Sequence, residues 1–441
     1  MSNNFIDMIR DAGVVGAGGA GFPTHVKLSS KAEYIIINAA ECEPLIRVDQ
    51  QLLLHFTKDF FEGLKKIIEE TQSSKAFIAI KAKHKEVINR LNELLPKYPS
   101  VEVYLLPDFY PAGDEQILVQ EVIKRVVPRG GIPLNVDCIV CNVETVINVF
   151  RALQGKAVTS TFVTVTGEVE RPATYEFSLG VSYREALEQC GVKNLDNKFG
   201  ILNGPMMGKL ISDFDIPVTK TTKAIILLDR EHLLFREKAK SIEQVLKQSR
   251  TACIQCQKCT DLCPRDLLGH DVKPHKVMRI VNYGLSDFLG MKTALGCSEC
   301  GACELYACPN GLSPRHINIM IKQELRGKGV KNEHTGKAFT ASCMMEYRKI
   351  PVKRLVARLG LKKYDVDAPF TRYEENLKKA VILLNQHQGA PVVSVVEKGM
   401  NVEKGQLIAK IDGEKLGANI HASIAGVITD ISDASITIEA R

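Results

Sequence analysis

Two closely spaced runs of cysteines, between residues 253 and 308, restrict the fold of this chain more than any other feature. The runs are Cys253-x2-Cys256-x2-Cys259-x3-Cys263-Pro264 and Cys297-x2-Cys300-x2-Cys303-x4-Cys308-Pro309. Three cysteines spaced in this way can wrap one face of a cubane cluster, because each thiolate reaches a different iron. A fourth cysteine has to arrive from elsewhere, so the fold must bring distant segments together.

The order of the cysteines suggests how the ligands are shared. In ferredoxins with two [4Fe–4S] clusters, the fourth cysteine of each run binds the cluster of the other run. We therefore expect one cluster on Cys253, Cys256, Cys259 and Cys308, and a second on Cys297, Cys300, Cys303 and Cys263. A pair of zinc sites is the alternative, but zinc prefers paired C-x2-C knuckles with a longer gap between the pairs. Two triple runs that each close with Cys-Pro favour iron–sulfur clusters.

The other cysteines and the chain ends indicate a reducing compartment. No apolar run approaches the length of a membrane span, and the N-terminus has no basic segment followed by an apolar core. We therefore expect a cytoplasmic protein whose 13 cysteines serve metal or redox chemistry rather than disulfides. Cys138, Cys190 and Cys343 have no partner at ligand spacing, so we expect them to be small buried side chains.

The charge pattern argues against nucleic acid as a partner. The net charge is +7, from 58 basic and 51 acidic residues, and no block of like charge stands out. Tryptophan is absent and aromatic residues make up only 6% of the chain, which also argues against base stacking as the main activity.

A chain of 441 residues is too long for one ordinary core, and its patterning predicts a multidomain α/β protein. In residues 1–155, apolar runs of strand length alternate with helical patterns, at 34–38, 76–80, 83–95, 114–126 and 137–141. This order predicts a Rossmann-like α/β domain with a largely parallel sheet.

The composition divides the rest of the chain into four segments. Residues 156–235 alternate apolar and polar side chains and are typical of a small β-rich α+β domain. Residues 236–345 are mainly helical and hold the cysteine runs, and residues 346–380, rich in Lys and Arg, are expected to form a linker with short helices. Residues 381–441 contain short strands broken by glycine, which predicts a small β-sandwich.

The segment Gly16-Ala-Gly-Gly-Ala-Gly21 formally contains the G-x-G-x-x-G motif of dinucleotide-binding folds. The context differs from that motif, because no strand runs into the loop and Phe22-Pro23-Thr24 follows where a helix should continue. A flexible glycine loop is the alternative interpretation. Such a loop can still offer backbone N–H groups to a phosphate.

Four segments in succession resemble the flavin-binding domain of the NADH-oxidising subunit of respiratory complex I: 16–27, 38–44, 110–116 and 141–145. The resemblance implies FMN contacts at Gly18, Gly19, Lys27, Asn38, Glu41, Glu115, Asn142 and Thr145. It also implies that Gly16 to Gly21 and Glu43 face the nicotinamide nucleotide, with Glu43 as the catalytic candidate. Ala40 stands where the complex I subunit has an acidic residue, so one polar flavin contact of that pattern is missing.

Other features resemble the RnfC protein of the ion-pumping Rnf complex. These are Glu41-Cys-Glu-Pro44 together with the two cysteine runs, and residues 164–172, which resemble a soluble-ligand-binding β-grasp (SLBB) domain. Residues 387–423 resemble the barrel-sandwich hybrid domain with which RnfC proteins usually begin, although here they lie near the end of the chain. That segment is also similar to lipoyl and biotinyl carriers, but Lys415 lacks the Met-Lys-Met context, so we expect it to be unmodified.

In this order of segments, nearly the whole chain resembles the cobalamin reductases of bacterial propanediol-utilisation microcompartments. The resemblance implies electron transfer from NADH through FMN and two [4Fe–4S] clusters to cobalamin, for reactivation of a B12-dependent enzyme. An adenosyltransferase and microcompartment shell proteins would be partners, and the protein would lie in the cytoplasm or inside the compartment. Two alternatives stay open: a soluble RnfC-like carrier that feeds another acceptor, and a non-catalytic scaffold or ferredoxin-like carrier without flavin.

Overall fold

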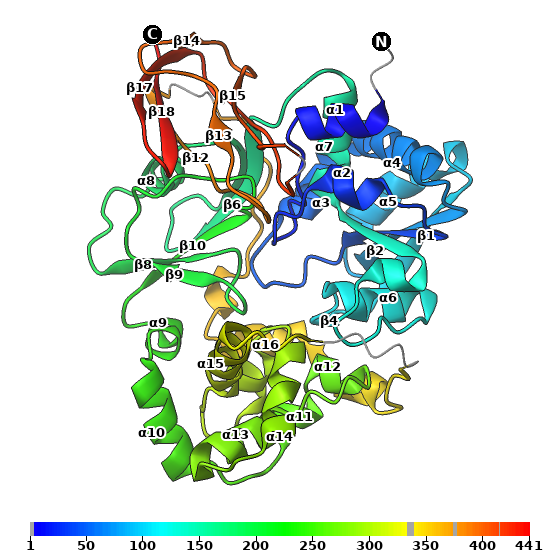
Figure 1. Cartoon of the computed structure of the whole chain (residues 1–441), viewed down its shortest axis with the longest axis vertical. Coiled ribbons are helices and arrows are strands. Elements are labelled where there is room, and N and C mark those ends of the chain that lie inside the picture. Colours follow the sequence, from blue (N-terminus) through cyan, green and yellow to red (C-terminus); the bar gives the residue numbers. More distant parts are fainter. Residues whose placement is uncertain (1–3, 333–338, 374–376, 414) are drawn as a thin grey trace.

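The computed structural model describes residues 4–332, 339–373, 377–413 and 415–441. Figure 1 shows an N-terminal α/β part on the right, β-rich parts on the left and a helical part below both of them. The expected multidomain α/β fold is confirmed. Among the described residues, no helix is both long enough and apolar enough to cross a membrane.

The N-terminal part is built on a parallel four-stranded sheet in the order β3-β2-β1-β5. The strands are β1 (Tyr34–Ala39), β2 (Lys75–Lys81), β3 (Val101–Leu106) and β5 (Cys138–Asn142). Strands β1, β2 and β5 confirm the strands expected from the apolar runs at 34–38, 76–80 and 137–141. The sequence analysis did not single out β3, because only its first and last residues, Val101 and Leu106, are buried, so it forms no buried apolar run.

Helices cover both faces of this sheet, which explains why its central strands read as continuous apolar runs. One face packs on α3 (Val48–His55), α4 (Thr57–Thr71), α5 (Lys85–Leu94) and α7 (Val143–Leu153), and the other on α6 (Glu115–Ile123). Asp114 caps α6 by accepting hydrogen bonds from the N–H groups of Gln116 and Ile117, as the sequence indicated. The helix ends at Ile123 because Lys124 adopts a left-handed conformation. The short helices α1 (Phe5–Asp11) and α2 (Thr24–Leu28) enclose the glycine loop.

The β-grasp part is a mixed sheet in the order β7-β6-β10-β8-β9, with helix α8 (Tyr183–Gln189) packed against it. Its strands are β6 (Ser160–Gly167), β7 (Ala173–Ser178), β8 (Lys198–Leu202), β9 (Lys209–Ile211) and β10 (Ala224–Asp229). The C-terminal part is a sandwich of two sheets, β12-β18-β17-β14 and β13-β15-β16. Their bounds are β12 (Lys379–Leu383), β13 (Val393–Ser394), β14 (Asn401–Val402), β15 (Leu407–Lys410), β16 (Ile420–His421), β17 (Gly426–Ile431) and β18 (Ser435–Glu439).

One continuous apolar core joins the β-grasp sheet to the C-terminal sandwich. Phe177 and Ile225 of the first belong to the same buried cluster as Ile382 and Ile438 of the second. The two parts also share backbone hydrogen bonds, such as Val381 N–H to the Gly180 carbonyl at 3.1 Å. They therefore pack as one body.

The helical part holds both cysteine runs. It contains α9 (Leu233–Lys238), α10 (Ile242–Ala252), α11 (Lys258–Asp261), α12 (Pro264–Leu267), α13 (Pro274–Tyr283), α14 (Phe288–Lys292), α15 (Pro314–Gly327) and a π-helical turn (Ala302–Ala307). Ser241 begins α10 with a capping box, in which its hydroxyl accepts from Gln244 N–H.

Residues 346–364, which the sequence analysis placed in a linker, pack against the α/β part. Strand β11 (Ile350–Pro351) pairs with β4 (Phe109–Tyr110), and α16 (Val352–Arg358) buries Leu355 and Val356 in the main core. Arg358 of α16 also donates to the Leu305 and Cys308 carbonyls of the helical part. This segment therefore connects the helical part to the α/β part that contains β1–β5 and α1–α7, which we call the flavin-type domain.

Candidate functional site

The carboxyl ends of two neighbouring parallel strands carry two of the residues expected to bind FMN. Asn38 at the end of β1 lies opposite Asn142 at the end of β5. Ligands of open parallel sheets bind at this edge. The Asn38 amide donates to the Gly113 carbonyl at 2.8 Å, and the Asn142 amide donates to the Asp49 carboxylate at 3.0 Å. Both asparagines are therefore held in fixed orientations.

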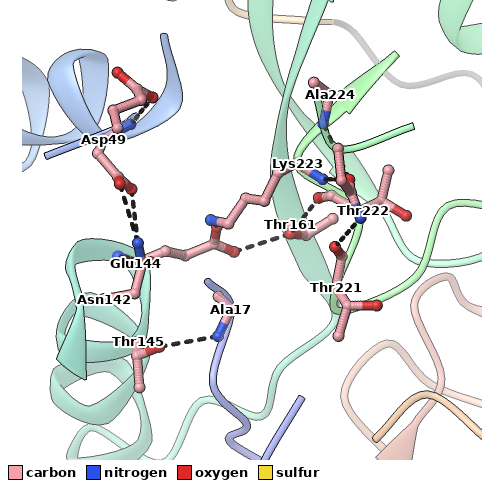
Figure 2. A network of polar contacts seen from close by, with 12 residues as sticks. Ala17, Asp49, Asn142, Glu144, Thr145, Thr161, Thr221, Thr222, Lys223 and Ala224 are labelled. Atoms are coloured by element: carbon pink, nitrogen blue, oxygen red, sulfur yellow. Dashed lines mark hydrogen bonds and ion pairs between the residues drawn. The ribbon is translucent and has the colours of Figure 1, made fainter. Parts of the chain in front are cut away.

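The glycine loop lies over Asn142. A Cβ atom at Gly18 would be 3.1 Å from Asn142 Cβ, closer than most such contacts, so a larger residue would require Asn142 to shift. A Cβ at Gly19, by contrast, would meet nothing within 4 Å, and Gly19 has a φ of +145°. Ala17 N–H donates to the Thr145 hydroxyl at 3.0 Å, which fixes the loop to the start of α7 (Figure 2). The structure thus brings Gly18, Asn142 and Thr145 together and leaves open space beside Gly19, and phosphate binding there stays a prediction.

The two ends of the loop differ in their surroundings. Gly16 N–H donates to the Phe22 carbonyl at 2.8 Å and closes the loop on itself. Gly21 has a φ of +68° and lies against the β-grasp and C-terminal parts, since a Cβ there would be 2.9 Å from Thr221 and 3.1 Å from His387. The loop is therefore supported from behind by two other parts of the chain.

Lys27 and Glu115 form an ion pair below this edge of the sheet. Lys27 Nζ lies 3.2 Å from Glu115 Oε1 and 2.9 Å from the Val140 carbonyl. Burial alone would lower the pKa of Lys27, but the Glu115 carboxylate and two nearby thiols raise it above its usual value. Lys27 thus keeps its positive charge close to the predicted flavin site, which is favourable for a phosphate.

A group of buried acidic residues lies next to Asn142. Glu41 accepts hydrogen bonds from Asp49 N–H at 2.8 Å and from the Gln50 amide at 2.7 Å. Burial raises the pKa of Asp49 to about 7, with the Glu41 charge as the next cause, and burial also raises the pKa of Glu41. One of these two carboxyl groups can therefore hold a proton near neutral pH.

Glu43 is engaged by a loop of the β-grasp part. Its two carboxylate oxygens accept hydrogen bonds from Met206 N–H at 2.9 Å and Met207 N–H at 2.8 Å. Burial raises the pKa of Glu43 to about 6. Both oxygens of the Glu43 carboxylate are thus engaged by backbone amides. The expected role of Glu43 at the nicotinamide nucleotide stays a prediction.

The four cysteines expected to hold the first cluster line one cavity. The cavity has a volume of about 30 Å³ and is lined by Cys253, Cys256, Cys259 and Cys308 among others. Cys308 comes from the second run, so the structure brings together the four cysteines expected to bind the first cluster, and the exchange of ligands itself stays a prediction. Among the described residues, no three His, Cys, Asp or Glu side chains are grouped to hold a single metal ion. A cubane differs from such a site because each thiolate binds a separate iron.

The second set also comes together. Burial raises the pKa of the Cys263 thiol far above its usual range, and the neighbouring Cys300 and Cys297 raise it further. Burial likewise raises the pKa of Cys300 to about 11 and that of Cys303 well above its usual value. A thiol in these surroundings stays protonated unless a metal replaces the proton. Glu299 N–H also donates to Cys297 Sγ at 3.4 Å, as backbone amides do around clusters.

The cysteines outside the runs differ from one another. Cys138 and Cys190 are buried, as expected. Cys343 is exposed, so the expectation that it is a buried apolar side chain is wrong. It lies in an exposed turn.

The sequence analysis missed the contacts that connect the parts around the site. Glu144 forms a buried ion pair with Lys223, and Thr161 donates to the same carboxylate at 3.0 Å (Figure 2). Arg265 forms a two-pronged ion pair with Asp114. No local pattern signals these pairs, because their members are distant in the sequence. Only the fold brings them together.

Four protein families match successive parts of this chain. They are the Nuo51 FMN-binding domain at residues 9–151, the SLBB domain at 162–210, the 4Fe-4S dicluster domain at 252–313 and the RnfC barrel sandwich hybrid domain at 361–441. FMN and two [4Fe–4S] clusters are therefore cofactors of this protein, which is an oxidoreductase.

Individual proteins are similar over different lengths. The cobalamin reductases PduS of Citrobacter freundii and Salmonella typhimurium are each 42% identical over 434 residues, which cover 98% of this chain and 95% of theirs. The RnfC-type component of the ion-translocating oxidoreductase complex of Salmonella arizonae is 34% identical over 60% of this chain and 38% of its own. The crystal structure of an NAD⁺-reducing [NiFe]-hydrogenase in the H₂-reduced state shares the fold, with a TM-score of 0.50 and 18% identity over 77% of this chain and 68% of that chain. By its similarity along almost its whole length, this chain belongs to the cobalamin reductase PduS family.

Proposed function

We propose that this protein oxidises NADH and delivers the electrons one at a time to cobalamin. The observation that carries the proposal is the direct contact between the flavin-type domain and the second set of cysteines, which contains Cys300. Tyr110 of the flavin-type domain donates its hydroxyl proton to the Cys300 carbonyl at 2.5 Å. The domain expected to bind the flavin thus lies directly against the ligands expected to bind one cluster. Electron transfer between the two cofactors requires this proximity.

The chemistry divides between the cofactors and the chain. FMN, when bound, accepts two electrons as a hydride and releases them singly, and the clusters carry one electron each. The residues provide binding and orientation: the amides of the glycine loop and Lys27 suit the phosphate, and Asn38 and Asn142 suit polar groups of the flavin. One NADH supplies two electrons and one proton, enough to reduce two cob(III)alamin to cob(II)alamin.

Cobalamin as the acceptor rests on the names of the relatives with 42% identity. The sequence lacks the Asp-x-His-x-x-Gly motif of tight cobalamin binders, so cobalamin would be a passing substrate. Reduction to cob(I)alamin is poorly matched to NADH, since that product is a very strong reductant. An adenosyltransferase that consumes cob(I)alamin would draw the reaction forward, as any product sink shifts an equilibrium. Such a partner, within a microcompartment, completes the proposed role.

The test is anaerobic reduction of cob(III)alamin by the purified holoprotein with NADH, with NADPH compared in parallel and a generic dye as control. We expect cob(II)alamin to form with NADH, and cobalt–carbon bond formation to follow when an adenosyltransferase and ATP are added. Rapid dye reduction without any cobalamin reduction, even with the adenosyltransferase present, would contradict the proposed acceptor.

A second function is favoured by the similarity to RnfC-type proteins over 60% of the chain. In that function the same electron path feeds another reductase or a redox cycle of the microcompartment. It would take over if dyes but not cobalamin were reduced. A scaffold without flavin, the remaining alternative, predicts that the purified protein has no flavin absorbance.

A further inference from the structure

The two cysteine sets differ in their surroundings. The set with Cys263, Cys300 and Cys303 is buried against the flavin-type domain. Besides the contact of Tyr110 with the Cys300 carbonyl, Arg265 donates to both oxygens of Asp114, at 2.6 and 2.9 Å. Both side chains of this ion pair are nearly buried, with exposed fractions of 11% and 12%. Three cysteines of this set are therefore buried beside the flavin-type domain, and the fourth, Cys297, is half-buried.

The other set lies at the surface of the helical part. Cys256 is exposed, and Cys253 and Cys259 are half-buried. The cavity between them is also lined by Ile254, whose exposed fraction is 67%, and by His275 at the start of α13. An acceptor that approaches from solvent therefore meets this set first.

Exposed basic residues lie close in the sequence to the residues that line this cavity. Lys276 and Arg279 are exposed on the same face of α13, one turn apart, and Lys276 follows His275 of the cavity lining. Arg250 near the end of α10 and Lys258 at the start of α11 are exposed on either side of Cys253 and Cys256. None of these four basic residues forms an ion pair with any residue that the structure describes. We call Arg250, Ile254, Lys258, Lys276 and Arg279 the basic rim.

We propose that a protein with an acidic surface docks on the basic rim and carries the cobalamin, and that electrons leave the chain there through the cluster held by Cys253, Cys256, Cys259 and Cys308. Unpaired charges around an exposed apolar residue are typical of a surface that guides a partner of opposite charge. Each transfer would move one electron from the cluster that these cysteines hold to a cob(III)alamin carried by the partner, which would become cob(II)alamin. The inference rests on the proposed electron transfer, because the basic rim has this role only if the clusters are reduced.

The test uses two small haem proteins of opposite charge as probes, acidic cytochrome b5 and basic cytochrome c. The holoprotein is reduced with dithionite and desalted under anaerobic conditions, so that docking is measured without NADH oxidation. Reduction of each haem is followed by absorbance in a stopped-flow instrument. We expect the charge-reversal variant Lys276→Glu/Arg279→Glu to reduce cytochrome b5 about tenfold more slowly than wild type and cytochrome c faster, as expected when electrostatic steering is reversed.

The matched control is Lys58→Glu/Lys65→Glu on α4. These lysines are also exposed on one face of a helix, and the variant has the same net charge, but α4 lies at the far side of the molecule from the helical part (Figure 1). We expect its rates with both haem proteins to stay close to those of wild type, and iron content with low-temperature EPR spectra to match in all three proteins. Equal slowing in control and rim variants, or no slowing in the rim variant, would overturn the inference.

A parallel measurement separates this inference from the proposed function. If NADH fails to reduce the clusters of wild type while dithionite-reduced protein still shows the rim effect, the proposed function fails and the docking surface stands. If NADH reduces the clusters but the rim has no effect, only the docking surface is refuted.

Discussion

The buried ion pair between Glu144 and Lys223 allows a prediction about how two parts of the chain hold each other. Glu144 lies at the start of α7 in the flavin-type domain, next to Thr145, and Lys223 directly precedes β10 of the β-grasp part. The side chains are 1% and 9% exposed. Thr161 donates to the second oxygen of the carboxylate at 3.0 Å, so the pair is well supported (Figure 2).

The expected magnitude follows from burial. Removing one partner leaves an uncompensated buried charge, so Lys223→Met and Glu144→Gln should each lower the free energy of unfolding by about 3–5 kcal/mol. The double variant leaves no isolated charge. It should therefore be about as stable as the better single variant or more stable, which gives a coupling energy of about 3 kcal/mol or more between the two sites.

The assay is an anaerobic urea titration of the holoprotein, followed by far-UV circular dichroism and by the fluorescence of released FMN. The control pair is Lys66 and Glu69 on the exposed side of α4, which are 2.7 Å apart with side chains about half exposed. Its coupling should be below about 1 kcal/mol, because solvent screens exposed pairs. If the Glu144 and Lys223 losses simply add in the double variant, the reasoning about the buried pair is wrong.

Four further predictions follow from the site and its surroundings. Lys27→Glu should lower FMN occupancy after purification while Lys27→Arg retains it, since the first places a negative charge beside the predicted phosphate; full occupancy in Lys27→Glu would contradict this site. Cys308→Ala should remove the cluster of the first run, leaving about four irons of about eight per chain, whereas loss confined to the second run would refute the exchange of ligands. Burial lowers the pKa of Lys220 to about 7. At pH values between about 7 and the ordinary lysine pKa, this lysine therefore holds a proton in the unfolded chain but not in the folded one. The free energy of unfolding should consequently rise with pH through this range. Lys220→Met should flatten that rise in urea midpoints measured across the window, and an unchanged slope would exclude Lys220 as its source. Lys415 should be unmodified, so the intact mass of the stripped protein should equal the sequence mass, without a lipoyl or biotinyl addition.

Local patterns predicted the elements that depend on local physics. The runs at 34–38 and 137–141 became β1 and β5 because parallel strands buried on both faces need continuous apolar side chains. Asp114 marked the start of α6 because a capping carboxylate acts within three residues. The grouping of cysteines followed from ferredoxin precedent.

Contacts between distant segments could not be predicted in this way. Lys223 meets Glu144 across 79 positions, and Tyr110 meets Cys300 across 190. Nothing in either neighbourhood marks a partner, because the pairing depends on how whole domains pack. The exposure of Cys343 was missed for a related reason, since burial depends on what covers a turn and not on the residue itself.

The apolar core shared by the β-grasp sheet and the C-terminal sandwich bears on how such proteins arose. The sandwich is held by Ile382, Ile438 and their neighbours against the β-grasp sheet, rather than by the point at which the chain enters it. A gene that encoded the same sandwich ahead of the flavin-type domain would supply the same contact surface. These contacts therefore do not require the sandwich to stand at this end of the chain.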